Sequence, residues 1–213
     1  MRRLQVAGIL AVMLWVSGCS SKNAPEYNKS DIYWYQKMVH YVSVGDLDKA
    51  DDYFTSLQSE HFASPLLKEA MLILAQAHMD EEEYLLAKYY LDEYIKRFGD
   101  PKSIQFAKFL KIKASFLAFK NINRDQKLLQ ETIEEAKEYK KEYPSSEFVP
   151  MVDTILTKLT MAQYVLDEEI AALYERRGKP KAAKFYRDRL KNLWVEKSQI
   201  DVPKKWYDYL INW

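Results

Sequence analysis

The chain has 213 residues, with 32 lysines and arginines against 31 aspartates and glutamates. This near balance leaves no strong positive field, so we expect no nucleic-acid partner. Five glycines and seven prolines are few for a protein of sheets and turns, whereas residues that favour helices are plentiful. The composition therefore predicts an all-α protein.

Residues 1–18 have the layout of a secretory signal peptide. A basic start precedes a run from Leu4 to Val16 that is apolar except for Gln5, and two small residues follow it. The run is shorter than the ~20 apolar residues that a membrane-spanning helix needs. We therefore expect an exported chain from which residues 1–18 are removed.

Cys19 is the only cysteine, so it forms neither an internal disulfide nor a cysteine-rich zinc site. With Val16-Ser17-Gly18 it resembles the lipobox of bacterial lipoproteins, whose cysteine receives a covalent diacylglycerol and an N-acyl chain. The resemblance implies that Cys19 is the lipid anchor, and no other cofactor is expected. Ser20 after the cysteine resembles the enterobacterial pattern for the outer membrane. The alternatives are an ordinary signal peptide with a chance cysteine, or a free buried thiol.

Residues 19–30 are expected to form a lipidated flexible tether, because polar residues and proline predominate there without apolar periodicity. From Asp31 onward apolar residues recur at helical spacing, which predicts one helical domain over 31–213. Ser64-Pro65 and Asp100-Pro101 each offer a cap followed by a proline, which is typical of a helix start. The expected units are four repeats near 31–62, 64–99, 101–143 and 146–195, followed by a tail over 196–213.

Three sets of residues share one spacing, which indicates an internal repeat. They are Tyr41-Gly45-Ala50, His78-Glu82-Ala87 and Tyr174-Gly178-Ala183. In this interpretation the aromatic residue packs on the partner helix, the glycine permits a tight turn, and the alanine lets two helices approach closely. Together with Trp34, Phe54 and Leu57, the first set resembles the tetratricopeptide repeat. The sequence therefore predicts a tetratricopeptide-like helical-repeat solenoid of about four helix pairs with an aromatic C-terminal tail.

The later repeats are less regular, since residues 121–126 interrupt the third unit and a long helix from about Pro150 to Arg177 opens the fourth. Three elements resemble, in order and spacing, the BamD family of outer-membrane assembly lipoproteins. They are Arg124-Asp125, Tyr143-Pro144-Ser145-Ser146-Glu147-Phe148, and Ala172-Leu173-Tyr174-Glu175-Arg176-Arg177-Gly178 followed by Ala182-Ala183. The resemblance covers roughly residues 19–195. Gln126 and Lys37 depart from the family pattern, and the fifth repeat of better-known relatives is expected to be missing.

The resemblance implies a non-enzymatic scaffold of the outer-membrane β-barrel assembly machine, lipid-anchored at the periplasmic face of the outer membrane of a Gram-negative bacterium. Its C-terminal half would bind the periplasmic domain of BamA, and its N-terminal repeats would bind unfolded outer-membrane proteins. The alternative is a repeat lipoprotein for another envelope assembly, such as a pilus secretin pilotin or a cell-wall division factor.

The first helix of each pair is expected to line a groove that binds extended peptides. The predicted substrate-peptide groove consists of Tyr33, Trp34, Tyr35, Val39, Val42, Leu72 and Gln76. Tyrosine suits such a surface because its ring buries area while its hydroxyl stays hydrogen-bonded. The alternative is that these aromatic residues belong to the core.

A second candidate surface, for partner docking, combines Arg176, Arg177, Arg187 and Arg189 around the turn at Gly178. The alternative for the first two arginines is that they stabilise a helix C-terminus through its dipole. Trp206 and Trp213 of the aromatic tail are further docking candidates. We expect this tail to fold back over the helix ending near Trp194, and the alternative is an aromatic anchor for BamA.

Catalytic and metal-binding patterns are weak. His40, His61 and His78 have no carboxylate or cysteine at ligand spacing, so they are interpreted as packing or surface residues and no metal site is expected. The acidic runs Asp80–Glu83 and Glu168-Glu169 place neighbouring carboxylates in different directions on a helix, so they are interpreted as caps and solvated faces. We therefore expect no enzyme, and a cell-wall hydrolase is disfavoured.

Overall fold

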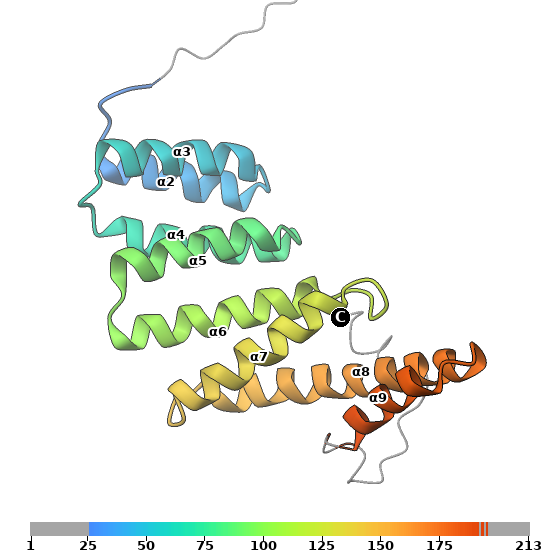
Figure 1. Cartoon of the computed structure of the whole chain (residues 1–213). Helices are drawn as coiled ribbons and strands as arrows, with labels where there is room; N and C mark the ends of the chain where they lie inside the picture. The colour runs from blue at the N-terminus through green and yellow to red at the C-terminus, as the bar shows by residue number, and fades with distance from the viewer. Residues whose placement is uncertain (1–25, 192, 194, 196–213) are drawn as a thin grey trace, which may run out of the picture. The chain divides into compact units, whose positions relative to one another are not determined.

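A computed structural model describes residues 26–191, 193 and 195. These residues form eight α-helices and no strand, in four consecutive pairs (Figure 1). The helices are α2 (Asp31–Ser43), α3 (Leu47–Glu60), α4 (Leu66–Asp80), α5 (Tyr84–Phe98), α6 (Pro101–Ala118), α7 (Gln126–Glu142), α8 (Val149–Arg176) and α9 (Pro180–Leu190). The all-α, tetratricopeptide-like prediction is confirmed. None of the helices in this described part combines the length and apolar character that a bilayer span requires.

Three of the inter-helix turns share one backbone conformation. Gly45, Glu82 and Gly178 have positive φ angles of 75°, 62° and 65°. Each is followed by an amide that donates to the carbonyl five residues earlier: Asp46 to Tyr41 (3.0 Å), Glu83 to His78 (2.7 Å) and Lys179 to Tyr174 (2.9 Å). The three sequence sets are therefore equivalent positions. In the second, a glutamate takes a conformation that favours glycine.

The alanine of each set is buried in the second helix of its pair. Ala50 and Ala87 are 0% exposed and Ala183 is 2% exposed. A larger side chain at these positions would have to displace the facing helix, as the spacing predicts.

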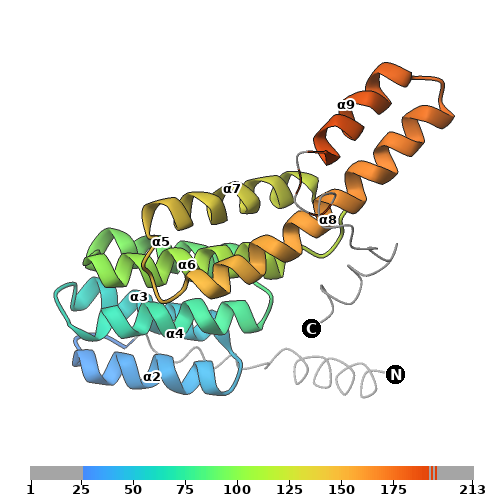
Figure 2. The same ribbon diagram turned by 90° about the horizontal axis from the view of Figure 1, so that it is seen from below.

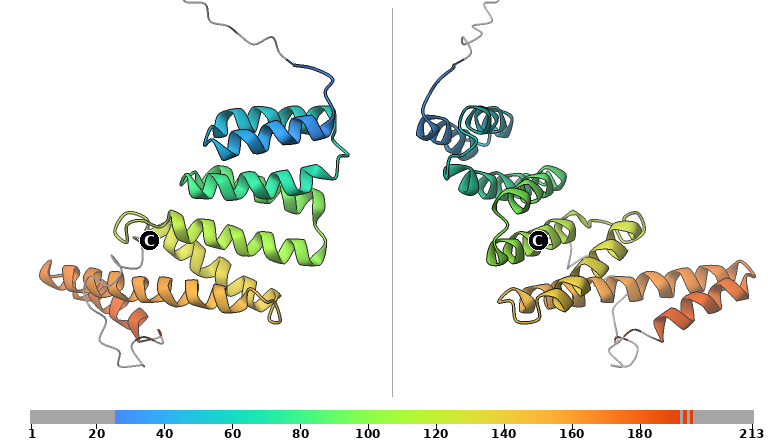
Figure 3. Two further views of the ribbon diagram at one scale, coloured as in Figure 1. Left: turned by 180° about the vertical axis from the view of Figure 1, so that it is seen from behind. Right: turned by 60° about the vertical axis from the view of Figure 1, so that its left-hand side comes forward.

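The first two pairs stack directly, because α4 contacts both α2 and α3 (Figure 3). The third unit is looser, since α6 packs more on α5 than on α7, and α7 more on α8 than on α6. The cause is the connection over residues 119–125, which takes the place of a tight turn. Phe119 and Ile122 anchor this connection in the core, and Asn121 and Asp125 accept hydrogen bonds from its own backbone amides.

Helix α8 has 28 residues and continues beyond the part that packs on α7 (Figure 2). Its C-terminal half pairs with α9. Tyr174 stacks on Tyr186 with ring centroids 5.8 Å apart. Among the described residues, the continuous apolar core runs from Trp34 to Leu166, so the α8–α9 pair lies at its margin.

Candidate binding surfaces

The residues of the predicted peptide groove lie on α2 and α4, two helices that contact each other. Tyr35, Val39 and Val42 of α2 are half-buried against the core, at helical spacing along one face. Burial, reinforced by the nearby carboxylate of Glu69 in α4, raises the pKa of Tyr35. This proximity joins the faces of the two first helices.

On α4, the same face continues through Leu72 and Gln76. Leu72 is half-buried against the core, whereas Gln76 is exposed and donates to Asp80 Oδ1 at 2.7 Å. Tyr33 is also half-buried and packs edge-to-face on Trp34, with Lys37 Nζ 5.8 Å from its ring centroid. A mixed apolar and hydrogen-bonding surface of this kind fits an extended polypeptide.

Trp34 is the exception, and its assignment to the groove is wrong. It is 1% exposed, and its Nε1 donates to Glu60 Oε2 at 2.8 Å. Successive helical residues point about 100° apart, so the position before Tyr35 faces the partner helix α3 rather than solvent. Trp34 is a core residue.

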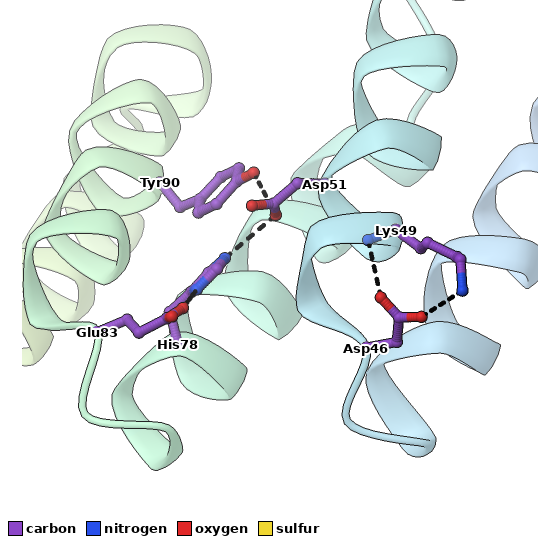
Figure 4. Close-up of polar contacts among 6 residues, drawn as sticks. All are labelled: Asp46, Lys49, Asp51, His78, Glu83 and Tyr90. Atoms are coloured by element: carbon purple, nitrogen blue, oxygen red, sulfur yellow. Dashed lines mark hydrogen bonds and ion pairs between the residues drawn. The ribbon is translucent and has the colours of Figure 1, made fainter.

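A polar cluster around the buried ring of His78 joins the first pair to the second (Figure 4). His78 of α4 is 1% exposed, and its Nε2 and Nδ1 lie 3.1 Å from Asp51 Oδ1 and 2.6 Å from Glu83 Oε2. The hydroxyl of Tyr90 donates to the same Asp51 oxygen at 2.7 Å, and its ring stacks on His78. Burial alone would lower the pKa of His78, but the two carboxylate hydrogen bonds outweigh it and raise the pKa.

This cluster was missed by the sequence analysis, which found no carboxylate at ligand spacing from His78. The carboxylate of Asp51 is supplied by α3, 27 residues away, so local spacing carries no signal for it. Among the described residues no group of three histidine, cysteine or acidic side chains has the arrangement of a metal site.

The four arginines of the predicted docking surface divide into two kinds. Arg187 forms a bidentate pair with Glu175, at 2.8 and 2.9 Å, and Arg189 Nε lies 3.2 Å from Asp167 Oδ2. These two therefore tie α9 to α8. Arg176 and Arg177 are exposed at the C-terminal end of α8.

Arg176 borders a cleft of about 470 Å³ along α8. Val165, Ile170 and Leu173 supply its apolar part, while Glu168 and Glu169 supply carboxylates. A cleft with apolar walls and both signs of charge at its edge suits a folded partner domain better than a small ligand.

Asp167, the partner of Arg189, is 1% exposed, and its Oδ2 has no hydrogen bond. Burial raises the pKa of Asp167 to about 6, although the charge of Arg189 opposes this.

Cys19, Trp206 and Trp213 lie outside the described residues, as does the predicted signal peptide.

These features define a class of protein, a helical-repeat protein with two candidate binding surfaces, one across α2 and α4 and one on α8 and α9. The profile of the YfiO family, described as an outer membrane lipoprotein, matches residues 27–193. The chain therefore belongs to this family, which confirms the predicted lipoprotein class and outer-membrane localisation.

Two relatives extend the assignment. The outer membrane protein assembly factor BamD of Helicobacter pylori is 39% identical over 208 residues, covering 96% of this chain and 94% of that protein. The BamD of Caulobacter vibrioides is 26% identical over 104 residues, 49% of this chain and 34% of that protein. The predicted resemblance to the BamD family is confirmed.

Proposed function

We propose that the protein is a lipid-anchored scaffold of outer-membrane protein assembly that binds BamA and unfolded outer-membrane proteins and catalyses no reaction. The observation that carries this proposal is the similarity, over nearly the whole of both chains, to a protein named as an outer membrane protein assembly factor. The mechanism is positional: each partner is held near the other, which raises the effective concentration of the substrate at the machine.

The α2–α4 groove is proposed as the site for unfolded substrate. Its half-buried Tyr35, Val39 and Leu72 offer apolar area on a fixed backbone, and exposed Gln76 offers a donor and an acceptor for an extended chain. Because the helices behind it are tightly packed, little ordering is needed on binding.

The α8–α9 face is proposed as the site for the periplasmic domain of BamA. Arg176 and Arg177 are exposed there, Arg176 at the edge of the 470 Å³ cleft, whereas Arg187 and Arg189 tie α9 to α8 through ion pairs. Exposed arginines are suited to bidentate pairing with partner carboxylates.

The anchor is proposed to be Cys19 with its covalent acyl chains. Replacing Cys19 with alanine in cells given a labelled fatty acid tests this directly, and continued labelling of the mutant would reject it. Attachment to the membrane confines both binding surfaces to two dimensions near the site of insertion.

The docking proposal is tested by copurification from detergent-solubilised membranes. We expect Arg176→Glu with Arg177→Glu to reduce recovery of BamA strongly, while Lys102→Glu with Lys141→Glu, two exposed lysines elsewhere, leaves recovery unchanged. Recovery of a pilus secretin or a division complex in place of BamA would favour the alternative functions.

The groove proposal is tested with a photoreactive amino acid at Gln76 and, as a control, at exposed Thr55 of α3. We expect crosslinks to unfolded outer-membrane proteins from Gln76 only. Equal crosslinking from both positions would contradict a specific groove.

A further inference from the structure

The outer side of α5 carries an exposed apolar surface that the proposed function does not use. Leu85, Leu86 and Tyr89 are 86%, 43% and 51% exposed, on adjacent turns of one helix. In the described part of the chain, no other helix carries more than one exposed large apolar side chain. We call these three residues the α5 patch. Clustered apolar exposure of this kind indicates a covering partner.

The patch borders a hollow of about 360 Å³. Leu85 and Leu86 form one side of the hollow, Ala118 of α6 and Leu128 of α7 line the others, and nearly all of its exposed lining is apolar. Its edge is acidic on balance, because the four exposed carboxylates of the run Asp80–Glu83 outnumber Lys88, which lines the hollow, and Lys120, which pairs with Glu82. The hollow therefore fits apolar or aromatic side chains that are accompanied by positive charge.

We propose that the occupant of the α5 patch is the chain's own C-terminal segment, residues 203–213. This segment lies outside the described residues, and its sequence matches the surface. Lys204 and Lys205 are followed by an aromatic and aliphatic cluster made of Trp206, Tyr207, Tyr209, Leu210, Ile211 and Trp213. The two lysines complement the acidic edge, and the cluster complements the hollow.

The path from the end of the described chain is short. Tyr186 and Arg189 of α9 line a cavity together with Gln126 and Gln130 of α7, so this part of α9 and the first turns of α7 border the same space. Leu128, in those same turns, lines the hollow of the α5 patch. The segment has only to pass the N-terminal turns of α7, a helix about 10–12 Å wide.

The chain length is sufficient for this path. The 11 residues 196–206 follow Val195, the last described residue. Fully extended, they reach about 36–40 Å, which is more than three helix diameters. Trp206 can therefore enter the hollow with slack in the connection.

The test uses cysteine reactivity in the full chain carrying Cys19→Ala, so that an introduced thiol is the only one. Leu85→Cys reports on the patch, and Met151→Cys, at an exposed apolar position on α8, is the matched control. We expect Leu85→Cys to react with a maleimide about tenfold more slowly in the full chain than in a chain ending at residue 202, because labelling then requires local opening. Met151→Cys should react equally in both chains.

A second variant avoids truncation. Lys204→Glu with Lys205→Glu in the full chain should speed the labelling of Leu85→Cys, because like charges then meet at the acidic edge. Equal labelling of Leu85→Cys in the full and shortened chains would overturn the proposal. Protection that disappears on dilution would also overturn it, since a second copy of the chain would then be the occupant.

Discussion

The two N-terminal helix pairs and the two C-terminal ones follow the same repeat plan but differ in how tightly they are packed. In α2–α5 the turn within each pair has the left-handed residue, both register alanines are 0% exposed, and the polar cluster around His78 joins the pairs. In α6–α9 one tight turn is replaced by residues 119–125, and α9 is tied to α8 by ion pairs at the margin of the core.

The difference agrees with the two separate roles proposed for these halves. The surface proposed on α2 and α4 for unfolded substrate has a tightly packed backing, which would suit the capture of chains that bring no structure of their own. In the α8–α9 pair, α9 buries only Ala183 and Leu190, and two ion pairs cross to α8, so its stability should depend more on pH and salt. Substitutions at matched positions in the two halves, taken from the largest expected change in stability to the smallest, test this contrast, and so does pH.

The largest difference is expected for aromatic residues of the first and last pairs. Trp34→Ala removes a fully buried ring and should lower the free energy of unfolding by about 3–5 kcal/mol. Tyr174→Ala removes a half-buried ring whose stacking on Tyr186 contributes about 1 kcal/mol. Urea unfolding measures both, and equal losses would show that the two ends of the domain are packed alike.

Overpacking tests the same contrast at equivalent positions. Ala87→Leu should cost about 1–3 kcal/mol, because the facing helices are fixed by the neighbouring pairs. Ala183→Leu should cost less, since α9 contacts chiefly α8 and can shift. An unchanged melting temperature for Ala87→Leu would refute the register.

The sequence predicted the features that depend on local spacing. Gly45 and Gly178 with their alanines mark tight turns, because turn geometry and close approach are properties of neighbouring residues. Trp34 was misassigned because a groove residue and a core residue can be adjacent in a helix. The pairing of His78 with Asp51 and of Arg187 with Glu175 was not predictable, because the distance between these side chains depends on how the helices stack.

Backbone strain at the turns should be local and therefore equal in the two halves. A β-carbon at Gly45 or Gly178 would meet nothing within 4 Å, so an alanine there costs only the left-handed conformation, about 1–2 kcal/mol. Glu82→Gly removes that strain and should stabilise the protein by about 1 kcal/mol, since its exposed ion pair with Lys120 contributes little. Calorimetry of the three variants measures these changes, and a destabilised Glu82→Gly would contradict them.

The two halves should also differ in the pH range over which their stability changes. The pKa of His78 is raised in the folded protein. Its contribution to the free energy of unfolding is therefore complete below its unfolded-state pKa, near 6.5, and is lost as pH rises through its folded-state pKa. Asp167 also has a raised pKa, about 6 against 3.8, so the stability linked to its protonation is lost as pH rises between these values. Asp51, Glu83 and Tyr90 surround the histidine, whereas Arg189 faces the aspartate.

Thermal unfolding should therefore lose stability with rising pH in two windows, one for each half of the domain. Asp167→Asn should remove the slope between about pH 4 and 6, because the amide carries no titrating proton, and leave the slope above pH 6.5 intact. His78→Gln should do the reverse. If either substitution flattened both windows, the two halves would be coupled as a single unit, and the contrast drawn from their packing would not extend to their energetics.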